Sequence, residues 1–223
     1  MKKFIFLVML LLSFNVLATY DNQNKTWLGI FGKKKLQDHD FSVWQEMQYR
    51  YDFEQGGMQQ LLTRVGLLKS INESHEVGMI MGYIQTRGAK LGSVDTKEYR
   101  PTLQHIYNTS FDEHKLLFRS RLEWRDEEDR DTNSIRYRIQ NSYRHQLNPT
   151  YSMLVWEEPF LNLSGEKWVG NRLLERNRFF LGVRIDQSSN HRFEVGYMNQ
   201  YVPKKFANKA DVSEHVLVGY FFF

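Results

Sequence analysis

The sequence contains no cysteine and, after its first 18 residues, no long apolar run. The absence of cysteine excludes disulfide bonds, thiol chemistry and a lipoprotein type of export signal. A transmembrane helix needs a run of about 18 apolar residues or more, so the chain after residue 18 contains none. The formal charge of +4 is too small to indicate a nucleic-acid partner or an acidic one.

The N-terminus has the pattern of a cleaved signal peptide. A basic start, MKK, precedes the apolar stretch FIFLVMLLLSFNV, and Val16 and Ala18 occupy the −3 and −1 positions before polar residues. The apolar run, at roughly 14 residues, is short for a membrane-spanning helix. We expect residues 1–18 to be removed and residues 19–223 to form one exported domain. The alternative is an N-terminal hydrophobic helix of the fold.

The stretch HKLLFRSRLEWRDEEDRD, which begins at His114, alternates apolar and charged side chains. Leu122 and Trp124 share one face of the predicted strand, whereas Arg121 and Glu123 share the other, because successive side chains of a strand point to opposite sides. In a soluble barrel the charged face would meet water. In a transmembrane barrel the aromatic side chains would meet lipid and the arginines would fill the lumen.

The same alternation recurs along the mature chain, and no helical period competes with it. Eleven candidate strands lie at about 27–31, 41–51, 61–67, 77–83, 98–107, 116–125, 135–144, 151–158, 178–185, 192–201 and 214–223. Bacterial barrels normally have an even number of strands. We therefore predict an all-β, antiparallel, up-and-down barrel of ten to twelve strands. Either 27–31 is not a wall strand, or one further strand is hidden.

Three features favour the membrane setting over a secreted soluble barrel. Many of the candidate strands run for roughly 9 to 12 residues, which suits a tilted crossing of a bilayer. Short connections such as SINES and QLNP alternate with longer ones such as LSGEKWVGNRLLE, as in outer-membrane barrels. The chain stops on a strand whose final aromatic residues, Phe221 and Phe223, resemble the signal read by the barrel-assembly machinery. We expect an outer-membrane location in a Gram-negative bacterium, with membrane lipid and that machinery as partners and no nucleic acid.

Several motifs together resemble a known family. They are TWLGIFG, EYRPTLQH, FRSRLEWR, IRYRIQ, WEEPFL, NRFFLGVRI, EVGYMNQY and HVLVGYFFF, in this order along the mature chain. They are similar to the bacterial family catalogued as domain of unknown function 2490, which is regarded as a family of outer-membrane barrels. The resemblance implies the fold and the location, and it implies no activity, substrate or catalytic residue.

On this reading the inward face is dense in arginine and carboxylate. The lumen-lining arginines are predicted at Arg50, Arg64, Arg100, Arg119, Arg121, Arg125, Arg136, Arg138, Arg144, Arg178, Arg184 and Arg192, and the acids at Glu46, Glu98, Glu123, Glu158, Asp186 and Glu194. Arginine and carboxylate satisfy each other through paired hydrogen bonds. The leading interpretation is a structural lumen network. The alternative is a narrow anion-preferring pore, because the arginines outnumber the acids.

An outer-membrane enzyme is the third possibility, and the sequence offers little for it. Barrel lipases resemble one another in a His-x-Ser pair, and none of the seven histidines here has serine two residues later. The run Asp38-His39-Asp40 is interpreted as a solvated turn, and the acidic run 126–131 as a solvated loop rather than a Ca²⁺ site. We therefore expect no enzyme activity, no cofactor and no metal site.

Overall fold

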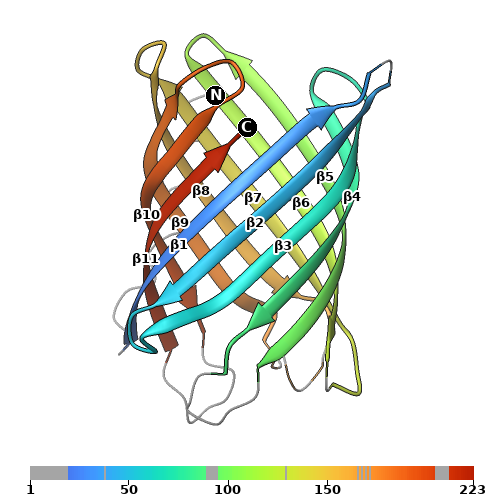
Figure 1. The fold of residues 1–223 in the computed structure, drawn as a ribbon, viewed down its shortest axis with the longest axis vertical. Coiled ribbons are helices and arrows are strands. Elements are labelled where there is room, and N and C mark those ends of the chain that lie inside the picture. Colours follow the sequence, from blue (N-terminus) through green and yellow to red (C-terminus); the bar gives the residue numbers. More distant parts are fainter. Residues whose placement is uncertain are drawn as a thin grey trace.

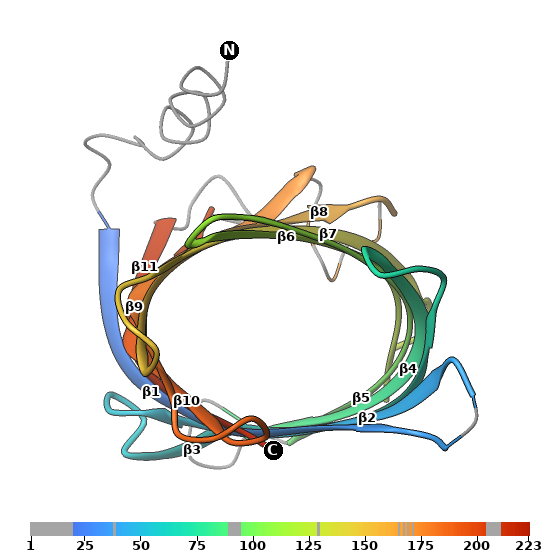
Figure 2. The same ribbon diagram turned by 90° about the horizontal axis from the view of Figure 1, so that it is seen from above.

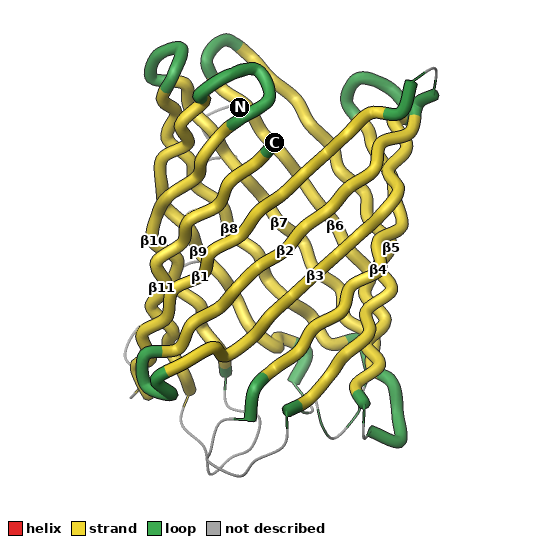
Figure 3. The backbone as a smooth tube through the Cα atoms, in the orientation of Figure 1, coloured by secondary structure: helices red, strands yellow, loops and turns green. Residues whose placement is uncertain are grey.

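A computed structural model describes residues 20–37, 39–88, 95–128, 130–164, 166, 168, 170, 172–203 and 211–223. The predicted signal peptide lies outside the described residues. Across the described chain all regular structure is strand (Figure 3). The eleven strands are β1 (Tyr20–Lys35), β2 (Phe41–Asp52), β3 (Gly57–Ser70), β4 (His75–Thr86), β5 (Thr96–Phe111), β6 (His114–Glu127), β7 (Ser134–Gln146), β8 (Tyr151–Asn162), β9 (Leu174–Asp186), β10 (Arg192–Val202) and β11 (Asp211–Phe222) (Figure 1).

The strands close into one barrel in sequence order, as Figure 2 shows from above. Each consecutive pair is antiparallel, whereas β1 and β11 meet in parallel, with Tyr20 beside Asp211 and Phe31 beside Phe222. The predicted up-and-down barrel is confirmed. The expected even number of strands is wrong for the described chain, because residues 27–31 belong to the wall strand β1 and no twelfth strand is present. When consecutive strands alternate in direction, an odd number leaves the first and last strands parallel.

The two ends of the barrel differ in their connections. We call the end that carries the connections 36–40, 71–74, 112–113, 147–150 and 187–191 the short-turn end; it is uppermost in Figure 1. The opposite, long-loop end carries 87–95, 128–133, 163–173 and 203–210, together with the short turn 53–56. From β3 onward the connections thus alternate in length as the sequence predicts.

Apolar side chains cover the outside of the barrel, and charged side chains fill much of the inside. In β6, Leu122 and Trp124 are 41% and 48% exposed, whereas Arg121 and Glu123 are 3% and 0% exposed. Met79 on β4 shows the same outward placement, at 69% exposure. A soluble barrel would have the reverse arrangement, because its apolar face would be the one removed from water. The arrangement therefore matches the one expected for a membrane barrel.

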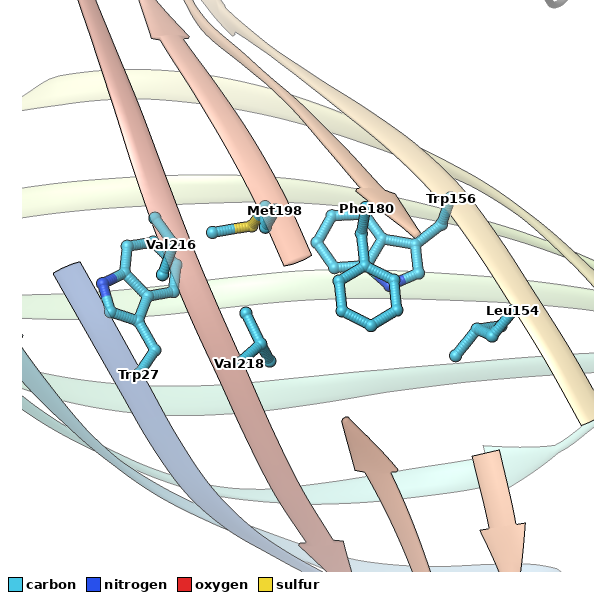
Figure 4. Packing of buried hydrophobic residues seen from close by; sticks show 7 residues of the cluster. All are labelled: Trp27, Leu154, Trp156, Phe180, Met198, Val216 and Val218. Carbon is cyan, nitrogen blue, oxygen red and sulfur yellow. The ribbon is translucent and has the colours of Figure 1, made fainter. Parts of the chain in front are cut away.

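One side of the interior is apolar rather than charged. The inner faces of β1 and of β8 to β11 carry a buried cluster (Figure 4) of Trp27, Leu154, Trp156, Phe180, Met198, Val216 and Val218. The Trp156 and Phe180 rings stack, with centroids 5.0 Å apart and planes 12° apart. Glycine makes this possible: a Cβ on Gly182 or Gly196 would lie 2.5 or 2.7 Å from the Phe180 ring.

Candidate functional site

Strand alternation directs the predicted charged residues of eight strands into the lumen, and the structure shows where each of them lies. Buried positions hold Glu46, Arg50, Arg64, Glu98, Arg100, Arg121, Glu123, Arg125, Arg136, Arg138, Glu158 and Arg178. Half-buried positions hold Arg119, Arg144, Arg184, Asp186, Arg192 and Glu194. The fully buried group occupies the long-loop half and the middle of the barrel. Of the half-buried group, Arg144, Arg184, Asp186, Arg192 and Glu194 lie towards the short-turn end.

Glu123 of β6 is the centre of the buried network. Its Oε2 accepts hydrogen bonds from Arg136 Nε and Nη2 at 2.8 and 2.5 Å, and its Oε1 accepts one from Arg138 Nη1 at 2.7 Å. Arg138 also donates from Nη2 to Glu158 Oε1 at 2.7 Å. Each ion is thus held by partners on neighbouring strands, which is the condition under which buried charge is tolerated.

The network continues towards the long loops. Glu98 accepts hydrogen bonds from Arg125 Nε and Nη2 at 2.8 and 3.1 Å, and from Arg100 Nε at 2.8 Å. Glu175 links this group to the first one, because it lies 3.5 Å from Arg125 Nη1 and 3.1 Å from Arg136 Nη1. The charged side chains of β5, β6, β7 and β9 therefore form one continuous network.

Two aromatic rings, Trp27 and Phe160, extend the network to β8, β1 and β2. The guanidinium groups of Arg50 and Arg178 lie 3.8 and 4.7 Å from the centroid of the Trp27 ring. Arg138 and Arg178 lie 4.3 and 4.5 Å from the centroid of the Phe160 ring. Guanidinium groups stack favourably on such faces, particularly where water is excluded. An unbroken series of contacts thus joins the inner faces of β2, β1, β9, β8, β7, β6 and β5.

Sequence reasoning missed the buried acid Glu175. The alternation in β9 puts Arg176 and Arg178 inward, so Glu175 was assigned to neither face. The register between β8 and β9 shifts at Phe160 and Leu161, a bulge that leaves Glu175 unpaired and turns its side chain inward. A single sequence gives no signal of a bulge there.

A second missed group lies where β1 meets its two neighbours. Lys25 of β1, 2% exposed, lies 3.4 Å from Asp52 of β2 and 2.6 Å from Glu214 of β11. Gln200 donates a further hydrogen bond to Glu214. The first residues of β1, YDNQNK, are polar on both faces and show no alternation in the sequence. The sequence therefore predicts this strand only from Trp27 onward, and Lys25 was missed.

The interior also holds a cavity of about 830 Å³ that reaches from the middle of the barrel to the short-turn end. Among the described residues that line it, eleven are lysine or arginine and five are glutamate. At the short-turn end the lining includes Lys115, Arg144, Arg184, Arg192 and Glu194. The cavity is therefore strongly cationic, and Arg138, Glu158 and Arg178 of the buried network line its inner part.

The other candidate groups are mostly structural or lie outside the described chain. Asp38 and Asp129 are outside the described residues, so the runs 38–40 and 126–131 are described in part. His105 lies on the outer face, with its Nε2 3.0 Å from His75 Nδ1. In the part of the chain that the structure describes, no three His, Cys, Asp or Glu side chains are grouped as metal ligands. No helix there is long and apolar enough to cross a membrane.

Comparison with known proteins gives one family and one fold. A family model described as a protein of unknown function (DUF2490) matches residues 24–210. No curated protein matches the chain significantly. Among solved structures, the NanC porin, determined in a rhombohedral crystal form, is similar with a TM-score of 0.53 and 9% sequence identity. The match covers 85% of this chain and 87% of the NanC chain. At this identity the similarity concerns the barrel fold.

Proposed function

The chain belongs to the DUF2490 family of proteins of unknown function, as its sequence motifs predicted, and from this premise we propose that it is a structural barrel of the bacterial outer membrane whose lumen is closed by arginine and glutamate. The proposal assigns it no catalytic step. Its main support is the burial of Glu123, Arg136, Arg138 and Glu158, each at most 4% exposed. They belong to the series of contacts that joins the inner faces of seven strands. This packing of long side chains supports a lumen without a continuous water-filled path.

The outer surface supports the membrane location. Aromatic contacts gather at two levels of the outer face: Tyr107 with Phe118 and Phe193 with Phe221 near the short-turn end, and Tyr83 with Tyr99 near the long-loop end. Aromatic girdles at both interfaces and an apolar band between them are typical of outer-membrane barrels. The predicted signal peptide at 1–18 agrees with export.

Cell fractionation tests the location. We expect the protein in the outer-membrane fraction, with a gel mobility that changes on boiling, as folded barrels show. Recovery of a folded protein in the soluble periplasmic fraction would contradict the membrane proposal and favour the soluble-barrel alternative.

Liposome swelling tests the closed lumen. Liposomes that contain the folded protein should swell in a small neutral sugar no faster than protein-free liposomes. Swelling at a rate proportional to protein content would show an open lumen and would overturn the proposed closure. Refolding must be confirmed by gel mobility in the same samples.

A narrow anion-preferring pore is the second candidate, and the composition of the cavity favours it. Eleven cationic against five acidic side chains line that space. A cationic lining lowers the barrier to anions and raises it to cations. The closed barrel and the anion-preferring pore differ in whether the buried network leaves a conducting path. A conductance measurement distinguishes them.

The final aromatic residues support a proposed partner, the barrel-assembly machinery. Phe221 and Phe223 lie next to each other, with ring centroids 6.1 Å apart, and the Phe223 backbone bonds to Phe31 and Lys33 of β1. The substitution Phe223→Ser keeps those backbone bonds. It should lower the amount of barrel assembled in cells while leaving refolding in detergent unchanged. The matched control is Phe193→Ser, on the neighbouring strand; equal assembly of both variants would contradict the proposal.

A further inference from the structure

At the short-turn end of the cavity two cationic side chains face each other across a strand pair. Lys115 of β6 and Arg144 of β7 are directly opposite in the β6–β7 register. Both occupy lumen-facing positions and line the cavity, Lys115 exposed at its mouth and Arg144 half-buried. Like charges directly opposite each other in a sheet are destabilising. The barrel keeps both cations here, although a carboxylate in place of either one would remove the repulsion between them.

No carboxylate in the described chain contacts this pair directly; Asp186 and Glu194 act on Arg144, and Asp186 on Lys115, at longer range. Neither Lys115 nor Arg144 has an ion pair or a side-chain hydrogen bond among the described residues. The neighbouring arginines do have partners: Arg184 donates to Asp186 at 2.7 to 3.1 Å, and Arg192 lies 3.7 Å from Glu194. Lys115 and Arg144 therefore lack a direct carboxylate partner, and they lie beside space large enough for a small solute.

We propose that Lys115 and Arg144 bind an oxyanion group, phosphate or carboxylate, of a small solute that enters the cavity from the short-turn end. A guanidinium group presents two parallel donors that match the oxygens of such a group, and the lysine ammonium adds a point charge. Ser142 lines the cavity on the same face of β7 and offers a hydroxyl donor. This site goes beyond the proposed structural role, and it exists whether or not the lumen conducts.

Calorimetric titration of the refolded protein in a zwitterionic detergent with inorganic phosphate tests the site. We expect saturable binding at neutral pH, and little heat from chloride at the same ionic strength. Lys115→Gln and Arg144→Gln should each weaken binding about tenfold or more, since a hydrogen bond to a charged group contributes at least that factor. Lys97→Gln is the matched control, because Lys97 is an exposed lysine at the opposite end; it should leave binding unchanged. A parallel titration with acetate distinguishes a phosphate-selective site from one that accepts any oxyanion.

A stability measurement separates a binding site from a solvated pair of cations. Without phosphate, Lys115→Gln should raise the urea midpoint of unfolding, because it removes the repulsion. Phosphate should raise the midpoint of the wild type and leave that of the variant unchanged. Phosphate binding no tighter than chloride binding, or equal stabilisation of wild type and variant by phosphate, would overturn the proposal. Neither assay measures transport. A failure of the proposed binding site would therefore not bear on the proposed closure of the lumen.

Discussion

Arg136 of β7 donates two hydrogen bonds to one oxygen of Glu123 on β6, inside a barrel whose outer face is apolar, and the Glu123 side chain has no contact with solvent. The pair lies in the network that fills the long-loop half of the lumen. A charge buried to this degree is stable when its partners remain in place, and it is costly when one of them is removed. The network therefore makes folding sensitive to each of its members, and on the proposed function it also closes the lumen.

Glu123→Gln should destabilise the barrel. The substitution leaves Arg136 and Arg138 buried with one counter-charge fewer, so we expect a loss of about 3 kcal/mol in the free energy of unfolding. Urea unfolding in detergent, followed by gel mobility, measures it. Glu128→Gln is the control, because Glu128 pairs with Lys97 at an exposed site; its effect should stay within about 0.5 kcal/mol. Equal effects of the two substitutions would show that the Glu123 ion pairs add nothing to stability.

The parallel closure of β1 on β11 can be tested by cross-linking, because the chain has no cysteine of its own. Leu28 lies beside Gly219, and a Cβ on Gly219 would be 3.2 Å from the Leu28 side chain. The double variant Leu28→Cys/Gly219→Cys should form a disulfide on mild oxidation of the folded protein. The pair Leu28→Cys/Ser213→Cys, offset by about 20 Å along the strand, should not. A disulfide in the second pair alone would contradict the parallel register.

Two lumen-facing glycines should respond to alanine in opposite directions. A Cβ on Gly196 would lie 2.4 Å from the Leu181 carbonyl oxygen, so the backbone must shift. We expect Gly196→Ala to lower the free energy of unfolding by about 1–3 kcal/mol. At Gly82 the nearest atoms are 3.4 and 3.5 Å away, which is ordinary contact. Gly82→Ala should stabilise the barrel by about 0.4–1 kcal/mol through the unfolded chain. The same urea series measures both; stabilisation by Gly196→Ala would contradict the close packing of β9 and β10.

The sequence predicted the barrel and its inner face well because both depend on a local rule. Alternation with a period of two places Arg121 and Glu123 inward and Leu122 and Trp124 outward, whatever the rest of the chain does. This local rule does not identify the tertiary partners of these residues. Glu123 and Arg136 lie 13 residues apart in sequence, and which oxygen binds which guanidinium depends on the register between strands.

What the sequence did not predict depends on departures from that rule. The bulge at Glu175 reverses the alternation, so a buried acid that compensates Arg125 and Arg136 was missed. The closure of β1 on β11 joins residues almost 200 positions apart, and the even-number rule for bacterial barrels gave the wrong expectation. The apolar inner wall around Phe180 was also unexpected. Because β11 is apolar on both faces, its alternation does not show which of its side chains face the lumen.

Single-channel conductance in a planar bilayer, with the inserted protein shown to be folded by its gel mobility, tests the closed lumen most directly. The account predicts a silent bilayer for the wild type under a salt gradient, because the network from Glu98 to Glu158 fills the long-loop half of the barrel. Discrete anion-selective steps whose selectivity shifts on Arg121→Glu would contradict it. They would make the lumen arginines the filter of a pore.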